Sequence, residues 1–278
     1  MCRVLHTVIC VVLFCVNYSF AQELRPVVNQ AGMLVYKGEY GDNLICHIQT
    51  DTDQQDGKWG YINKKGKLVI RVQFDDADYF SDGYARVRKG DKYGFIDSTG
   101  KLAIYYLYDD AKAFDPEYGL ALVQRSGKWG WINKKGEYQI ACRFEAAYPF
   151  YRGLAMVKLN GKYGYIDVSG RFRVQCRFDN LSPFGDNGYA LAEQSGKWGF
   201  VDTTGAIPIG CKFDGVFPFQ DDLAAVKIGT KWGFVDTKGT IVIQPQYDYV
   251  ESFYKGKALV ELDETLFYIN KDGEEVEK

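Results

Sequence analysis

The stretch GKWGFVD at residues 196–202 indicates the fold, because the chain repeats it in register. Each of the first six copies holds an aromatic residue, a glycine and a second aromatic residue, and successive copies lie 34 to 36 residues apart. Self-similarity at such a period is typical of tandem-repeat proteins. The copies are GKWGYIN (57–63), DKYGFID (91–97), GKWGWIN (127–133), GKYGYID (161–167), GKWGFVD (196–202), TKWGFVD (230–236) and a degenerate ETLFYIN (264–270).

Two positions in each copy are structural candidates. The glycine predicts a close approach of neighbouring backbone or a β-bulge. The aromatic residues are expected to fill the space between repeats, where burying one ring contributes about 2 to 3 kcal/mol. The opening aromatic residues are Trp59, Tyr93, Trp129, Tyr163, Trp198 and Trp232, and the glycines are Gly60, Gly94, Gly130, Gly164, Gly199 and Gly233.

The residues around each copy predict strands joined by tight turns. Apolar and polar residues alternate with a period of two in YARVRK (84–89) and KLAI (101–104), as in half-buried β-strands. Every copy ends in Asn/Asp-x-x-Gly, a pattern that closes a short hairpin. A further short strand is expected around the Tyr-Phe or Pro-Phe pairs, which gives four strands per repeat. These pairs stand at 79–80, 149–150, 183–184 and 218–219.

The motif Lys-Trp-Gly-(Phe/Tyr)-(Ile/Val)-(Asp/Asn)-x-x-Gly, preceded by Phe-x-x-Gly-x-Ala-x-Val, resembles the WG-repeat family of bacterial proteins. The resemblance covers residues 57–273, with degenerate first and last repeats. This chain departs from the motif with Tyr93 and Tyr163 in place of Trp. The resemblance implies a tandem β-repeat, and it brings no catalytic residues to transfer.

The expected fold class is therefore all-β, a tandem repeat of antiparallel units of about 34 residues. Seven hairpins carry the turn, and seven candidate strands precede them if a degenerate strand near 44–48 is counted. We favour closure into a seven-unit propeller-like ring, which would leave few exposed sheet edges. An open β-solenoid is the alternative, because about 34 residues is short for a propeller blade and worn terminal repeats resemble solenoid caps.

The first 21 residues are interpreted as a signal peptide. Arg3 precedes an apolar run over 8–16, and Ser19 and Ala21 are small residues suited to cleavage after Ala21. An uncleaved membrane anchor would need about 20 apolar residues. The repeat domain then occupies 22–278, where no stretch is long and apolar enough to span a bilayer. We expect export to the periplasm, the cell surface or the medium.

Four cysteines remain after cleavage: Cys46, Cys142, Cys176 and Cys211. The last three hold the same position in successive repeats, and disulfides are permitted in an exported chain. One interpretation is a disulfide between neighbouring repeats. We favour the other, a small buried hydrophobic residue, because apolar residues hold this position elsewhere.

The sequence predicts no catalytic, cofactor or metal site. His47 is the only histidine after cleavage, and nucleotide-binding and zinc motifs are absent. Acidic residues recur in register, and we favour turn capping over calcium binding for them: Asp75, Asp109, Glu145, Asp179, Asp214 and Asp248. The lysine before each opening aromatic is expected to solvate a sheet edge rather than to form a cation–π contact.

Charge and motif content together indicate a non-enzymatic binding scaffold. A net charge of −2, from 34 basic and 36 acidic residues, argues against a nucleic-acid partner. The expected partner is a protein or a cell-envelope component. The alternatives are a glycan-binding module that uses exposed aromatic residues and, less favoured, a hydrolase that uses paired carboxylates.

Overall fold

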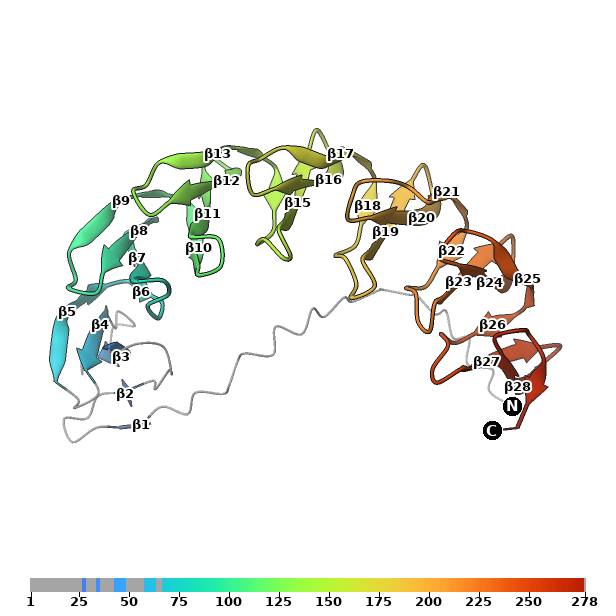
Figure 1. Cartoon of the computed structure of the whole chain (residues 1–278). Coiled ribbons are helices and arrows are strands. Elements are labelled where there is room, and N and C mark those ends of the chain that lie inside the picture. Colours follow the sequence, from blue (N-terminus) through green and yellow to red (C-terminus); the bar gives the residue numbers. More distant parts are fainter. Residues whose placement is uncertain (1–26, 29–33, 36–42, 49–57, 64–66, 278) are drawn as a thin grey trace, which may run out of the picture. The chain divides into compact units, whose positions relative to one another are not determined.

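A computed structural model describes residues 27–28, 34–35, 43–48, 58–63 and 67–277, and every regular element in them is a β-strand (Figure 1). The chain divides into two compact parts, Met1–Gln73 and Phe74–Lys278. The interpretation of 1–21 as a signal peptide lies outside the described residues. Within them, no helix has the length and hydropathy needed to cross a membrane.

The first part contains one antiparallel sheet, sheet 1, whose strands pair in sequence order. The strand expected near 44–48 is confirmed as β3, and the first copy of the motif forms β4. The strands of sheet 1 are β1 (Val27–Val28), β2 (Leu34–Val35), β3 (Asn43–Ile48), β4 (Lys58–Asn63) and β5 (Leu68–Phe74).

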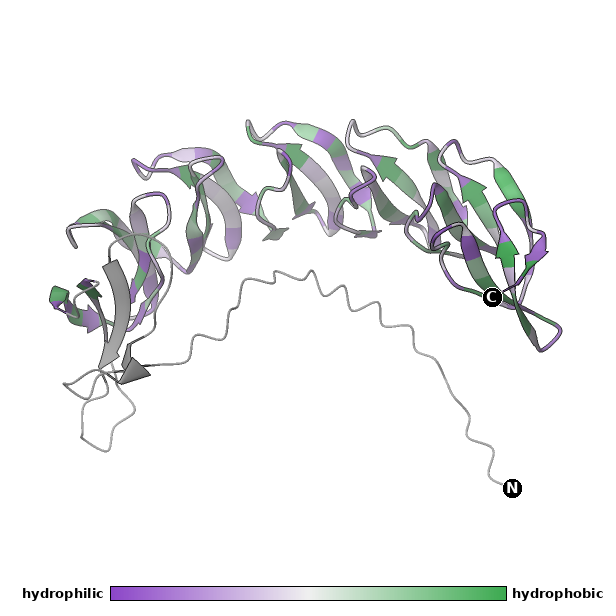
Figure 2. Ribbon diagram, turned by 60° about the horizontal axis from the view of Figure 1, so that its bottom comes forward, coloured by the Kyte–Doolittle hydropathy of each residue, from purple (hydrophilic) through white to green (hydrophobic). Residues whose placement is uncertain are grey.

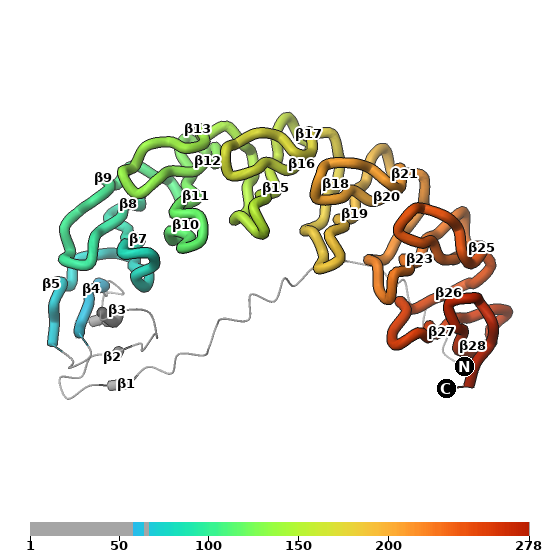
Figure 3. The backbone as a smooth tube through the Cα atoms, in the orientation of Figure 1, coloured from blue at the N-terminus to red at the C-terminus, as the bar shows by residue number. Residues whose placement is uncertain are grey.

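The second part contains six four-stranded antiparallel sheets, and the chain completes each sheet before it begins the next (Figure 3). Sheets 2 to 4 consist of β6 (Asp76–Ala77), β7 (Tyr84–Lys89), β8 (Lys92–Asp97) and β9 (Leu102–Tyr108); β10 (Asp110–Asp115), β11 (Leu120–Arg125), β12 (Lys128–Asn133) and β13 (Tyr138–Phe144); and β14 (Ala146–Ala147), β15 (Leu154–Leu159), β16 (Lys162–Asp167) and β17 (Phe172–Phe178). Sheets 5 to 7 consist of β18 (Asn180–Leu181), β19 (Tyr189–Gln194), β20 (Lys197–Asp202) and β21 (Ile209–Phe213); β22 (Gly215–Val216), β23 (Leu223–Ile228), β24 (Lys231–Asp236) and β25 (Ile241–Tyr247); and β26 (Tyr249–Val250), β27 (Lys257–Leu262), β28 (Thr265–Asn270) and β29 (Glu275–Val276).

The expected all-β repeat of seven antiparallel sheets is thus confirmed, with one correction to strand position. The short first strand of a sheet precedes the aromatic pair instead of containing it, as β14 at Ala146–Ala147 shows against the expected 149–150. The aromatic pair lies in the connection that follows, which carries a phenylalanine into the core. Each strand pair of the described residues joins strands of one sheet, and among these residues no ladder closes the repeats into a ring.

The repeated glycine lies at a β-bulge, and both reasons expected for it hold. In sheet 3 the register passes from Trp129↔Phe144 to Trp131↔Ile140, so extra residues of β13 lie opposite Gly130. A Cβ atom on Gly130 would stand 2.5 Å from the carbonyl oxygen of Ile140. No side chain fits there, because β13 folds its backbone over this position.

The Asn/Asp-x-x-Gly turns form as predicted. The Asp97 Oδ1 atom accepts hydrogen bonds from the backbone N–H groups of Thr99 (2.9 Å) and Lys101 (3.1 Å). Gly100 has a φ of 85°, which favours glycine. Equivalent carboxylate or amide oxygens bond the turn at Asn133, Asp167, Asp202, Asp236 and Asn270.

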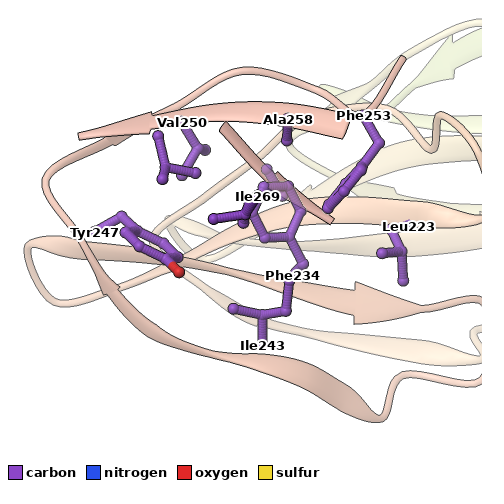
Figure 4. Close-up of a cluster of buried hydrophobic side chains, with 10 residues drawn as sticks. Leu223, Phe234, Ile243, Tyr247, Val250, Phe253, Ala258 and Ile269 are labelled. Carbon is purple, nitrogen blue, oxygen red and sulfur yellow. The ribbon is translucent and has the colours of Figure 1, made fainter. Parts of the chain in front are cut away.

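The core of the second part lies between consecutive sheets. Figure 4 shows one such layer, in which Phe234 and Ile243 of sheet 6 pack against Phe253, Ala258 and Ile269 of sheet 7. Adjacent residues of a strand point to opposite faces of the sheet, so Phe234 of β24 packs toward sheet 7 and Val235 packs toward sheet 5. Figure 2 shows the hydrophobic residues along the strands. The same layer recurs at each junction from sheet 2 to sheet 7.

The second aromatic residue of the motif lies at the centre of these layers. It is almost fully buried and meets a phenylalanine that belongs to the next sheet. The opening aromatic residues are half-buried and pack against the margin of the same layers, so both aromatic residues contribute to the space between repeats. The ring pairs are Phe95–Phe114 (4.9 Å between centroids), Trp131–Phe150 (5.1 Å), Tyr165–Phe184 (4.4 Å), Phe200–Phe219 (4.6 Å) and Phe234–Phe253 (4.8 Å).

Candidate functional site

The two charged positions that recur in the motif meet in space. The ammonium group of Lys231 lies 2.6 Å from Asp248 Oδ1, and Lys197 pairs with Asp214 at 2.5 Å. Lys92 with Asp109 and Lys162 with Asp179 form the same ion pair. These four lysines remain partly exposed to solvent, and each also forms an ion pair that the sequence analysis did not predict.

The second carboxylate oxygen of the same acids caps a hairpin turn, which is the role favoured from the sequence. Asp214 Oδ2 accepts a hydrogen bond of 2.8 Å from the backbone N–H of Gly229, in the turn between β23 and β24. The bond to the paired lysine lowers the pKa of Asp109, Asp179, Asp214 and Asp248. The described residues contain no group of three or more His, Cys, Asp or Glu side chains placed to hold a metal ion.

The opening aromatic rings are half-covered by cations of their own sheet. The ammonium group of Lys158 lies 5.0 Å from the centroid of Tyr163, and that of Lys227 lies 5.6 Å from Trp232. Phe217 also stacks on Trp232, with centroids 4.9 Å apart and an interplanar angle of 27°. Such contacts occupy the ring faces, so these residues do not form open platforms for a flat ligand.

The exposed aromatic residues are tyrosines outside the motif. Tyr105 on β9 is 72% exposed, and Tyr254 and Tyr151, at loop tips, are 70% and 51% exposed. Arg152 lies 5.2 Å from the Tyr151 ring centroid, and Lys255 lies 5.1 Å from that of Tyr254. The sequence analysis missed them; the signal that could have found them is the shared Phe-Tyr-(Arg/Lys)-Gly at two of the loops.

One polar cluster breaks the repeat, at the junction of sheets 2 and 3. Arg86 holds a position that is Leu122 or Leu191 in other sheets, and its side chain is 14% exposed. Its Nε donates to Asp78 Oδ2 (2.6 Å), and Nη2 donates to Asp78 Oδ1 (2.8 Å) and Asp76 Oδ2 (3.2 Å).

The cluster also ties the two sheets together. The Arg86 Nη1 atom donates to the carbonyl oxygen of Ala111 in sheet 3 at 3.1 Å and lies 3.9 Å from Asp110 Oδ1. Burial lowers the pKa of Arg86, but the hydrogen bond to Asp78 and the nearby carboxylates outweigh it and leave the pKa raised. The guanidinium group therefore stays positively charged and links sheet 2 to sheet 3. The sequence analysis missed it, although a charge in an otherwise apolar position was a usable signal.

Cys142, Cys176 and Cys211 are free, half-buried thiols, so the disulfide interpretation is not realised among these three. Each lies near a carbonyl oxygen of its own sheet, as Cys211 Sγ does at 3.3 Å from that of Ala192. Burial raises the pKa of all three thiols, that of Cys176 to about 11, which disfavours the reactive thiolate. The side chain of Cys46 lies outside the described residues.

Four-stranded antiparallel sheets that follow one another and share apolar layers define a tandem β-repeat protein. The chain belongs to the family described as "WG containing repeat", whose model matches residues 59–93, 93–129, 129–163, 163–198, 198–232 and 232–265. A comparison with curated proteins finds no match.

Several solved structures are similar in fold at low sequence identity. "Crystal structure of the eukaryotic initiation factor" has 12% identity and a TM-score of 0.42, with 85% of this chain and 75% of that chain covered. The dihydro-heme d1 dehydrogenase NirN has 12% identity and a TM-score of 0.35, with 90% and 67% covered. The AfRom2 CNH domain has 12% identity and a TM-score of 0.35, with 87% and 92% covered.

Proposed function

We propose that this protein is an exported, non-enzymatic scaffold that binds a protein or a cell-envelope component. The observation that carries the proposal is a constant interior beneath a variable exterior. In the fourth strands of sheets 2 to 6, one inward position is always Ile or Val and another is always Phe or Tyr: Ile104 and Tyr108, Ile140 and Phe144, Val174 and Phe178, Ile209 and Phe213, Ile243 and Tyr247. The exposed positions between them differ from sheet to sheet.

A repeat architecture allows the buried and the exposed residues to have separate roles. The shared apolar layers supply the stability of each sheet, so exposed residues are free to vary without loss of the fold. A set of different surfaces on one framework is what a binding scaffold requires. Export is supported by the sequence of residues 1–21, and it places the scaffold in the periplasm, on the cell surface or outside the cell.

The carboxylates favour binding over hydrolysis. A glycosidase needs two carboxyl groups, one to act as an acid and one as a base or nucleophile. Asp76 and Asp78 lie together but both accept hydrogen bonds from Arg86. Asp109, Asp179, Asp214 and Asp248 are each engaged by a lysine and a turn. The contacts of these four acids lower their pKa and so oppose a role as a proton donor.

The test is site-specific photocrosslinking of the full chain in the cell that produces it. A crosslinking amino acid would be placed at Tyr105 or at Tyr254, two exposed positions in different sheets, with an affinity tag at the C-terminus. We expect one partner to be captured reproducibly from one position and not from the other. A mature N-terminus at Gln22 is expected by mass spectrometry. A folded, exported chain that yields no position-dependent crosslink would contradict the proposal.

Glycan binding is the second candidate, and the exposed tyrosines favour it. Tyr105 and Tyr254 present large ring surfaces to solvent, and aromatic faces stack on the apolar faces of sugars. The opening tryptophans support it less, because they are half-buried. Oligosaccharide binding that is lost in Tyr105→Ala or Tyr254→Ala but kept in the matched Tyr138→Ala would support this candidate; retention in all three would count against it.

A further inference from the structure

The exposed positions of the fourth strands of sheets 2 to 6 carry positive charge and no negative charge. These strands, β9, β13, β17, β21 and β25, follow one another through the second part of the chain (Figure 1). Their exposed positions hold four cations and no carboxylate, whereas the whole chain has more acidic than basic residues. The exposed residues are Ala103, Tyr105, Leu107, Tyr138, Gln139, Ala141, Arg143, Arg173, Gln175, Arg177, Gly210, Lys212, Val242, Gln244 and Gln246.

Three of the cations repeat in register and are held in place. Arg143, Arg177 and Lys212 occupy the same position in three consecutive sheets, and each lies over the ring of the phenylalanine that follows it, at 5.0, 5.2 and 5.2 Å. The Arg143 guanidinium group also lies 5.6 Å from the ring of Phe172 in the next sheet. Contacts of this kind reduce the freedom of a long side chain, so the charges are already positioned before any ligand binds.

None of these cations forms an ion pair with a carboxylate among the described residues, and only Arg173 has a longer-range electrostatic interaction with one, Asp167. Arg143, Arg173, Arg177 and Lys212, together called the basic row, form none of the ion pairs of that part of the chain. The motif lysines Lys92, Lys162, Lys197 and Lys231, in contrast, are paired. The acid that follows Arg143, Glu145, is bonded to the backbone N–H of Gly161 at 3.0 Å. The basic row is thus available to an external anion.

The residues around the basic row narrow the class of anion. Exposed glutamines lie on the same strands, at Gln139, Gln175, Gln244 and Gln246. An amide both donates and accepts hydrogen bonds, which suits hydroxyl groups, while guanidinium groups bind carboxylates in pairs of parallel hydrogen bonds. Cations at the period of the repeat match a polymer, because a small anion would need only one of them.

We infer that the basic row binds an acidic polysaccharide, a chain that carries carboxylates with hydroxyl groups between them. The inference rests on the proposed binding function and specifies a ligand class for it. The sugar carboxylates pair with Arg143, Arg177 and Lys212, and the glutamines bond the hydroxyl groups. Since the contacts are exposed, binding weakens as salt concentration rises.

The test measures retention of polygalacturonate by the full chain, with neutral dextran as a reference. The variant Arg143→Gln/Arg177→Gln/Lys212→Gln removes three charges from exposed positions. We expect its affinity to fall by about 3- to 100-fold, since each exposed charge contact contributes a factor of about 1.5 to 5. The matched control Lys89→Gln/Lys128→Gln/Lys255→Gln removes three exposed charges elsewhere and should bind within about twofold of the wild type. Circular dichroism and urea unfolding check that all variants fold.

The outcomes separate the ligand class from the broader proposal. Equal loss in the control variant, or no loss in the basic-row variant, would overturn the site. Equal retention of poly-glutamate would overturn the assignment to a polysaccharide. If the wild-type chain does not retain polygalacturonate, the inference fails; position-dependent crosslinking to another partner would in that case still support the scaffold function.

Discussion

At the scale of single residues, the motif assigns different physical roles to positions that look alike in the sequence. Trp198 and Phe200 are both aromatic, yet only Phe200 is fully buried, against Phe219. The glycine between them determines this difference, because it admits the bulged backbone of the next strand. Phe200 is thereby directed into the layer between sheets, while Trp198 stays at the margin of its own sheet.

The first prediction concerns this glycine of the motif. Gly130→Ala should lower the free energy of unfolding by about 2 kcal/mol or more, because the new Cβ would meet the Ile140 carbonyl oxygen at 2.5 Å and force the strands apart. Gly210→Ala is the matched control: Gly210 also lies in a strand, but no atom lies within 4 Å of a Cβ placed there. We expect the control to be neutral or more stable by up to about 1 kcal/mol. Urea denaturation measures both, and equal effects would refute the argument from close approach.

The second prediction concerns Arg86. Arg86→Ala should lower the free energy of unfolding by about 2 to 4 kcal/mol, since it leaves Asp76 and Asp78 together without their partner. Replacing the set by its counterparts in sheet 5 (Leu191, Asn180 and Ser182), as Arg86→Leu/Asp76→Asn/Asp78→Ser, should recover most of that loss. Urea denaturation of both variants decides. A triple variant as unstable as Arg86→Ala would mean that the ion cluster outweighs apolar packing at this junction.

At the scale of the elements, one carboxylate organises two strand connections. Asp214 follows the fourth strand of sheet 5, caps the turn between β23 and β24 in sheet 6, and pairs with Lys197 on β20 in sheet 5. The acid therefore links consecutive sheets at the position where the chain crosses between them. Its repeats in the other sheets give each crossing the same polar link.

The acid links give the third prediction, a dependence of stability on pH. The pKa of Asp214 is lower in the folded chain than the unfolded value of about 3.9, so the link stabilises the fold above about pH 4 and is lost as the pH falls through the folded pKa. In Lys197→Met the hydrogen bond that lowers this pKa is absent. We expect the melting temperature of that variant to fall less steeply below pH 4 than that of the wild type. Parallel profiles from pH 2 to pH 6 would show that the ion pair carries no such linkage.

The elements also show how far the sequence predicts the structure. Strand β7 matches the expected 84–89, because strict alternation and flanking turns mark it. The two-residue first strands were misplaced, since so short a segment carries no period. The Lys–Asp links were not predicted as pairs, because the bulge that brings Lys231 to Asp248 changes the register in a way that the pattern does not reveal. The basic row could not be identified from the sequence, because its identification depends on which side chains are exposed, and alternation alone does not show this.

At the scale of the whole molecule, stability in the second part is distributed over similar junctions. Each apolar layer takes residues from two consecutive sheets, as Phe200 and Ile209 of sheet 5 meet Phe219 and Ala224 of sheet 6. Nearest-neighbour coupling of this kind makes stability an approximate sum over sheets and junctions. The fold should therefore tolerate a longer or shorter array, provided that whole repeats are gained or lost.

The fourth prediction follows from this additivity. Deletion of 163–197 removes one full period, from one opening aromatic to the residue before the next, and joins β14 and β15 to β20 and β21 in a new four-stranded sheet. We expect a folded β-protein, with a lower free energy of unfolding and a smaller dependence on urea concentration, because less surface is buried. Deletion of 163–179, about half a period, is the control; it removes β16 and β17 without replacing them and should leave an unfolded or aggregating chain. Circular dichroism and urea denaturation distinguish the two. If both deletions unfold the chain, the sheets depend on more than their nearest neighbours, and closure of the array becomes the first feature to test.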